Sequence, residues 1–115
     1  SAIPAYINTI EDKQNSKSIV RGAAGALQKI DSVIAIPYIV KNISDKDKNY
    51  RLSWTRLLQD AVNGIKRDKN DLSQAELSKT ISELETALKI IENSKNDFPQ
   101  HIAPFLRESI VELKK

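Results

Sequence analysis

The stretch from Leu72 to Ile91 constrains the fold of this chain more than any other part of the sequence. Its apolar residues recur at spacings of three and four, which places them along one face of an α-helix. They are Leu77, Ile81, Leu84, Leu88 and Ile91. Ser73 and Glu76 have the spacing of a capping box, and Leu72 and Leu77 have that of a hydrophobic staple. The pattern predicts an amphipathic helix that begins after Ser73 and needs other apolar faces to pack against.

Three further segments carry a stripe of the same kind: residues 16–35, 44–67 and 99–115. Pro37 is expected to end the first of these helices near Ala35. Pro104 interrupts the last stripe, so that helix either begins at Pro104 or is kinked there.

Four amphipathic helices joined by short polar segments predict an all-α fold, an up-down-up-down four-helix bundle over residues 16–115. Residues 1–15 are expected to form a short N-terminal arm with at most one helical turn. The first and third predicted helices are expected to face each other across the core. Their buried residues would then include Leu27, Ile30, Leu84 and Leu88.

Composition argues against several kinds of chemistry. The 115 residues fit one domain, and 40% apolar with 29% charged residues is typical of a globular chain. Without cysteine there is no thiolate catalysis, disulfide or cysteine zinc site. The single histidine, His101, precedes Ile102-Ala103-Pro104 and is expected to be a surface or capping residue. We therefore predict no enzyme activity, no cofactor and no metal site.

The charge is unevenly distributed along the chain. Residues 1–70 carry 12 basic and 7 acidic side chains (+5), whereas residues 71–115 carry 6 and 8 (−2). A larger protein complex with an acidic docking surface is therefore the expected partner. The candidate partner-binding cations are Lys46, Lys48, Arg51, Arg56, Lys66 and Arg67.

The segment Val33–Val40 is rich in β-branched residues although it lies where a polar connection is expected. One interpretation is that it folds inward and closes one end of the bundle. The other is that Ile36 and Tyr38 form an apolar docking patch, because contiguous exposed apolar surface usually marks an interaction site.

A second class of function is a nucleic-acid or anionic-surface binder acting through the basic helix 46–67. Such contacts to phosphates would be salt-sensitive and independent of sequence. Asp45, Asp47 and Asp60 alternate with the cations, however, so no specific nucleic acid is expected. The longest apolar run has eight residues and contains Pro37, too short to span a membrane.

Several features resemble the PsbQ-like extrinsic subunits of photosystem II. They are the N-terminal Ser1-Ala2-Ile3-Pro4, the helix of Trp54 with Arg51 and Arg56, and the order of four predicted helices over residues 16–115. The resemblance implies an exported and processed protein of the thylakoid lumen without an active site, peripheral to a membrane complex and supporting oxygen evolution. Bacterial immunity proteins are also small helical bundles of similar outline, so an immunity-type binding protein is an alternative.

Overall fold

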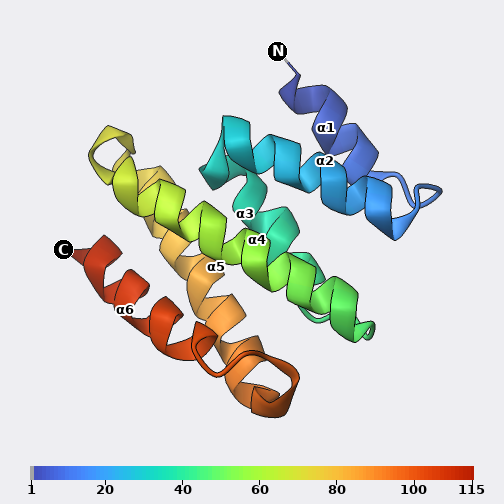
Figure 1. Cartoon of the computed structure of the whole chain (residues 1–115). Helices are drawn as coiled ribbons and strands as arrows, with labels where there is room; N and C mark the ends of the chain where they lie inside the picture. The colour runs from blue at the N-terminus through green and yellow to red at the C-terminus, as the bar shows by residue number, and fades with distance from the viewer. Residues whose placement is uncertain (1) are drawn as a thin grey trace.

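The computed structural model describes residues 2–115, which form six α-helices, two single turns of 3-10 helix and no strand. The chain runs through these elements as Figure 1 shows. They are α1 (Ile3–Glu11), α2 (Lys17–Ile30), α3 (Ser32–Asn42), α4 (Lys48–Arg67), η1 (Lys69–Asp71), α5 (Gln74–Asn93), η2 (Lys95–Asp97) and α6 (Ile102–Lys114).

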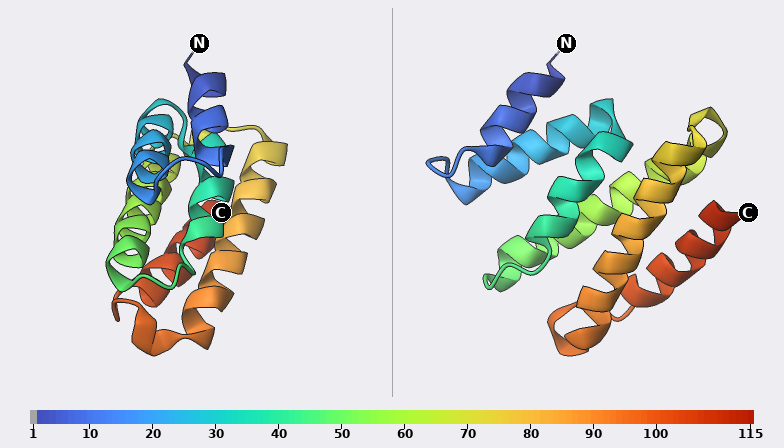
Figure 2. Two further views of the ribbon diagram at one scale, coloured as in Figure 1. Left: turned by 90° about the vertical axis from the view of Figure 1, so that its right-hand side faces the viewer. Right: turned by 180° about the vertical axis from the view of Figure 1, so that it is seen from behind.

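The helices pack as antiparallel hairpins that stand side by side: α1 with α2, α3 with α4, and α5 with α6. Helices α1, α3 and α5 form one layer, and α2, α4 and α6 form the other (Figure 2). Within the layers α3 contacts α5, and α4 contacts both α2 and α6. The Cα atoms span 40 × 38 × 17 Å, the thickness expected of two layers of packed helices.

The all-α prediction is confirmed, but six helices in two layers replace the predicted four-helix bundle. The predicted helix over residues 16–35 is divided at Asp31, whose backbone is extended (φ −154°, ψ 99°). Asp31 also starts the next helix, because its carboxylate accepts a hydrogen bond from the Ile34 N–H at 3.1 Å. Residues 32–42 therefore belong to a separate helix, α3, that returns in the opposite direction.

Helix α3 continues through Pro37, contrary to the expectation that this proline ends a helix. Pro37 has no N–H to donate to the Val33 carbonyl, and proline inside a helix costs about 3 kcal/mol. Burial of large apolar side chains offsets this cost, since each contributes roughly 1.5–3 kcal/mol. The buried residues of α3 are Ala35, Ile36, Ile39 and Val40. The inward-folding interpretation of Val33–Val40 is thus the correct one for these four residues.

The predicted N-terminal arm is a nine-residue helix, α1. Pro4 lies in its first turn, where a missing N–H breaks no helical hydrogen bond. Four half-buried side chains of α1 pack against the core: Ile3, Tyr6, Ile7 and Ile10. The side-chain amide of Asn15 donates to the Thr9 carbonyl at 2.9 Å and ties the following loop to the helix.

The start of α5 follows the prediction. The Ser73 hydroxyl accepts from the Glu76 N–H at 3.1 Å, and the Glu76 carboxylate accepts from the Ser73 N–H at 3.0 Å. Helix α6 begins at Ile102, two residues before Pro104, so the prediction that it begins at Pro104 is wrong. Pro104 lies in the first turn, where its lack of an N–H has no cost.

The core is centred on α4, whose buried residues include Trp54, Leu58, Val62 and Ile65. Leu27 and Leu84 are buried as predicted, but the side chain of Ile30 is 53% exposed and Leu88 is half-buried. The expected contact between the first and third predicted helices is also wrong, because α5 packs beside α3 rather than α2. Because the chain is divided at Asp31, α3 and not α2 packs beside α5, so the predicted contact of Ile30 with Leu88 does not form.

Candidate functional site

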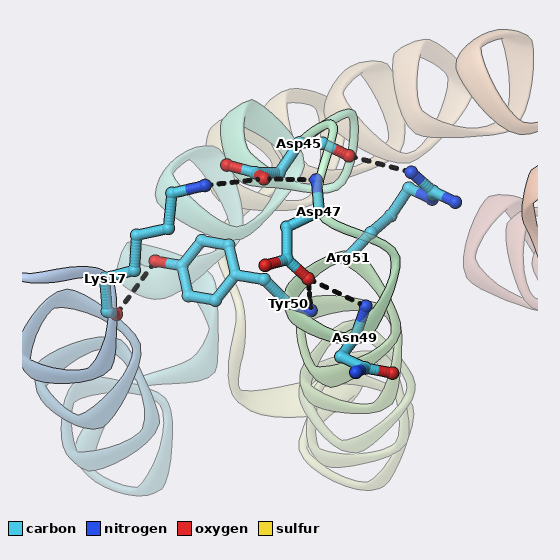
Figure 3. Close-up of polar contacts among 6 residues, drawn as sticks. All are labelled: Lys17, Asp45, Asp47, Asn49, Tyr50 and Arg51. Carbon is cyan, nitrogen blue, oxygen red and sulfur yellow. Dashed lines mark hydrogen bonds and ion pairs between the residues drawn. The ribbon is translucent and has the colours of Figure 1, made fainter.

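The turn between α3 and α4 holds a network of polar side chains, drawn in Figure 3. Asp45 accepts hydrogen bonds from the Lys17 ammonium at 2.9 Å and from the Asp47 N–H at 2.8 Å. Asp47 caps α4 by accepting from the N–H groups of Asn49 and Tyr50. The Tyr50 hydroxyl donates to the Lys17 carbonyl at 2.9 Å, which links α4 to the start of α2.

The network changes the pKa of two of its members. Burial works to raise the pKa of Asp45, but hydrogen bonds from the Asp47 N–H and Lys17 outweigh it, so this pKa is lowered. The hydrogen bond to Asp45 raises the pKa of Lys17. Both shifts favour the charged forms, so the turn holds an ion pair at neutral pH.

Arg51, predicted to bind a partner, belongs to the same network. Its guanidinium donates to the Asp45 carbonyl at 2.9 Å and to the Asp97 carbonyl at 3.1 Å. It also lies over the Phe98 ring, with 5.8 Å to the centroid. The side chain is only 12% exposed. Arg51 therefore fastens the α3–α4 turn to the segment between α5 and α6, and it has little surface left for a partner.

Lys66 and Arg67, at the other end of α4, are also engaged within the molecule. The Lys66 ammonium contacts the Ser109 hydroxyl at 3.3 Å and the Glu112 carboxylate at 3.6 Å, and it lies 5.0 Å from the centre of the Phe105 ring. Arg67 pairs with the adjacent Asp68 at 3.2 Å. Lys66 thus joins α4 to α6, whereas Arg67 is exposed and makes only a local contact.

The remaining predicted cations are Lys46, Lys48 and Arg56. All three are exposed, and none forms an ion pair with another residue in the described range 2–115. The predicted set is not brought together, because Lys48 and Arg67 stand at opposite ends of α4, about 28 Å apart along the axis. Residues 46–67 therefore present separate charges rather than one basic patch.

A groove of about 400 Å³ lies between α3 and α5. Its lining consists of Val33, Ile34, Ile36, Pro37 and Tyr38 from α3 and Glu76, Lys79, Thr80 and Glu83 from α5. The α3 side is apolar apart from the Tyr38 hydroxyl, and the α5 side is polar. Tyr38 is half-buried here, whereas Ile36 is fully buried and borders the groove from within the core. Of the predicted apolar docking pair, only Tyr38 is accessible.

The groove contains polar groups that the described chain leaves unpaired. Thr80 is 2% exposed, yet its hydroxyl makes no hydrogen bond with any residue from 2 to 115. The Tyr38 hydroxyl makes none within the same range. The Val33 carbonyl lacks its helical donor because residue 37 is proline. These three groups line the groove and can accept hydrogen bonds from a ligand, and the two hydroxyls can also donate them.

Sequence reasoning missed the α5 wall of this groove. The face that α5 buries carries Thr80, Leu84, Ala87 and Ile91, rotated slightly from the predicted stripe of leucines and isoleucines. Thr80 lies three residues after Leu77 and four before Leu84, and this spacing places it on the apolar face of the helix. The spacing alone therefore predicts that Thr80 is buried.

His101 precedes α6 and is exposed; its Nε2 lies 3.3 Å from the Gln59 side-chain oxygen. It makes no side-chain capping bond. Across residues 2–115 the side chains form no group of three or more His, Asp or Glu placed to hold a metal ion.

Comparison with known proteins gives no relative. No family model, no curated protein and no solved structure matches the chain. None of the helices formed by residues 2–115 has the length and apolar character needed to cross a membrane.

Proposed function

We propose that this chain is a non-catalytic protein-binding domain that docks on a larger protein complex. In this proposal a segment of the partner enters the groove between α3 and α5. The observation that carries it is the groove itself, whose walls hold the Thr80 and Tyr38 hydroxyls without a hydrogen-bonding partner among residues 2–115.

The chemistry of the groove suits a peptide segment. Val33, Ile34 and Pro37 offer an apolar surface for one side chain of the partner. The Thr80 and Tyr38 hydroxyls and the Val33 carbonyl can bond to the peptide groups on either side of it. Each such hydrogen bond contributes about 1 kcal/mol to the free energy of binding. Lys79 and Glu83 at the rim can select charged neighbours of that side chain.

The exposed cations Lys46, Lys48 and Arg56 give the proposal its second part. Long-range attraction from free lysine and arginine speeds the approach of an acidic partner, and salt weakens it. The alternative, an anionic-surface binder through residues 46–67, depends on these same cations, since Arg51 and Lys66 are engaged internally. The narrower assignment to photosystem II depends on the sequence resemblance alone.

The groove is tested by selecting binders from a display library of short random peptides. Thr80→Val keeps the shape of the side chain and removes the hydroxyl, so we expect it to weaken the selected peptides about five- to tenfold, the equivalent of one hydrogen bond. Isothermal titration calorimetry would measure the dissociation constants.

Thr86→Val is the matched control, because Thr86 is exposed on the same helix and its hydroxyl is already bonded to the Ser82 carbonyl. It should leave the affinity unchanged within about twofold. The proposal fails if the two variants bind alike, or if amide shifts from the bound peptide map outside residues 33–38 and 76–83.

A further inference from the structure

The division between α2 and α3 interrupts a helical pattern that the sequence continues. Apolar residues spaced by three, four, three and four cross the division, and one uninterrupted helix would place them along a single face. They are Val20, Ala23, Leu27, Ile30 and Ile34. In the structure α2 ends at Ile30, whose side chain is 53% exposed. Residues 29–33 contain neither glycine nor proline, so this segment suits a continuous helix as well as two separate ones.

Asp31 is the single residue between α2 and α3, which meet at a sharp corner (Figure 2). Its N–H donates to the Leu27 carbonyl at 2.8 Å, and its carbonyl accepts from the Ala35 N–H at 3.2 Å. Both are bonds that a continuous α-helix would contain. Its φ of −154° and ψ of 99° are extended, against about −63° and −42° in a helix. Rotation about the two torsions of this one residue is therefore enough to join the helices.

Side chains near Asp31 replace helical hydrogen bonds that the division removes. The Ser32 hydroxyl donates to the Gln28 carbonyl at 3.2 Å. The Asp31 carboxylate accepts from the Ile34 N–H at 3.1 Å. In a continuous helix the Gln28 carbonyl would instead accept from the Ser32 N–H, and the Ile34 N–H would donate to the carbonyl four residues earlier. The divided and the joined form thus exchange hydrogen bonds of similar strength.

Joining the helices would carry the α1–α2 hairpin away from the body formed by α3 to α6. Helix α1 packs chiefly on α2, so the two would move together. Helix α2 would leave α3 and α4, which it contacts in the closed form. The hydrogen bonds from Lys17 to Asp45 and from Arg21 to Ser53 would break. The surface that is left open on the body fits one element, a hairpin identical to the one that has moved away.

We propose that α2 and α3 join into one helix at Asp31 and that two copies of the chain then exchange their α1–α2 hairpins. The hairpin of the second copy presents the same side chains to the body, so the bonds of Lys17 and Arg21 form again, now between copies. Both walls of the α3–α5 groove stay within one copy. The exchanged dimer therefore presents the groove twice and can engage two segments of a partner at once.

The dimer is measured by analytical ultracentrifugation after refolding at a series of protein concentrations. Asp31→Ala removes the carboxylate that caps α3 and favours a helix at the hinge, and this gain counts once for each copy. We expect it to raise the dimerisation constant at least about tenfold over the wild type. Ser32→Pro should abolish the dimer, because proline suits the first position of α3 but breaks a continuous helix.

Ser16→Ala is the matched control for Asp31→Ala. Ser16 caps α2 through the same kind of bond, which it accepts from the Ile19 N–H at 3.3 Å. It follows a longer connection, residues 12–16, and does not lie at the hinge. The dimerisation constant should therefore change by less than about twofold. Circular dichroism checks that each variant is folded, and the comparison of the two alanine variants does not depend on Ser32→Pro.

The exchange itself is tested with spin labels at Ser18→Cys and Ser44→Cys, two exposed positions in a chain without cysteine. In the closed form the ion pair of Lys17 with Asp45 holds these positions close together. In the joined helix roughly 24 residues, or about 36 Å, separate Ser18 from the end of α3. Doubly labelled chains with the alanine hinge are diluted into an excess of unlabelled ones. Double electron–electron resonance should show the longer distance in the dimer fraction.

Three results would overturn the proposal. Equal dimerisation constants for Asp31→Ala and Ser16→Ala would show that the hinge does not control association. A short distance between the labels in the dimer fraction would show that closed copies associate side by side. Absence of a dimer of Asp31→Ala up to about 1 mM would show that the hairpins do not exchange.

Discussion

Cations on the same helix, α4, have opposite roles. Arg51 is 12% exposed and Lys66 24%, and each holds another element of the fold. Lys48 and Arg56 are exposed and form no ion pair among residues 2–115. Cations that look equivalent in the sequence therefore differ in exposure and in the contacts that they make. Arg51 lies beside the turn between α3 and α4, and Lys66 lies beside α6, so the neighbouring element decides whether a cation stabilises the fold or remains available to a partner.

The largest effect is expected for Arg51→Ala. Loss of its guanidinium leaves the Asp45 and Asp97 carbonyls without a donor and removes the contact with the Phe98 ring. Hydrogen bonds from charged groups contribute about 1.5–3 kcal/mol, so the free energy of unfolding should fall by about 2–3 kcal/mol. Urea denaturation measures it. Arg56→Ala is the control and should change this free energy by less than about 0.5 kcal/mol. Similar losses from the two variants would show that Arg51 and Arg56 do not differ in their contribution to stability.

A smaller effect is expected for Lys66→Ala. Its half-exposed contacts with Glu112 and the Phe105 ring are worth about 1 kcal/mol together. Lys66→Met keeps the aliphatic stem and removes the charge. If Lys66→Met is as stable as the wild type, the aliphatic stem contributes the stability and the charge contributes nothing. The charge of Lys66 would then resemble those of Lys48 and Arg56, which have no role in the fold.

The stability contributed by Asp45, which accepts from Lys17 and whose carbonyl accepts from Arg51, should depend on pH. Its pKa is lowered in the folded state, so its ionisation stabilises the fold above the unfolded pKa of about 3.9. That contribution is lost as pH falls through the lower folded pKa. The stability difference between wild type and Asp45→Asn should therefore be constant above about pH 5 and shrink below about pH 4. Thermal unfolding at a series of pH values checks this, and a difference that is unchanged at low pH would contradict it.

The smallest effect on stability is expected for Thr80→Val. Unlike Arg51, the side chain of Thr80 makes no hydrogen bond with residues 2–115, so replacing its hydroxyl by a methyl group breaks no bond and is nearly neutral or stabilising. The thermal midpoint should stay the same or rise slightly. A loss of more than about 1 kcal/mol would mean that the hydroxyl has a partner in the free protein.

Local signals in the sequence predicted the helices better than their arrangement. The capping box of Ser73 and Glu76 located the start of α5, because that signal lies within one helical turn. Ile3, Tyr6, Ile7 and Ile10 also have a helical spacing, but the segment is short and its other residues are mostly polar, so the pattern predicts at most one turn. Asp31 is the N-cap that separates α2 from α3, whereas Pro37 predicted the helix end near Ala35, four residues later.

The groove could not be predicted in the same way. Its two walls are 33–38 and 76–83, and their proximity depends on α3 packing beside α5. Nothing local to either segment encodes that choice. The internal use of Arg51 likewise depends on the Asp97 carbonyl, 46 residues away, being next to the α3–α4 turn.

The arrangement of the helices in a row also determines which parts of the molecule can unfold locally. Helix α1 packs chiefly on α2, so it can detach without breaking the contacts among the other helices. Helix α1 has no fully buried residue, whereas α4 has eight. The backbone amides of α1 should therefore exchange with solvent through brief local detachment, while those of α4 wait for the opening of the whole domain.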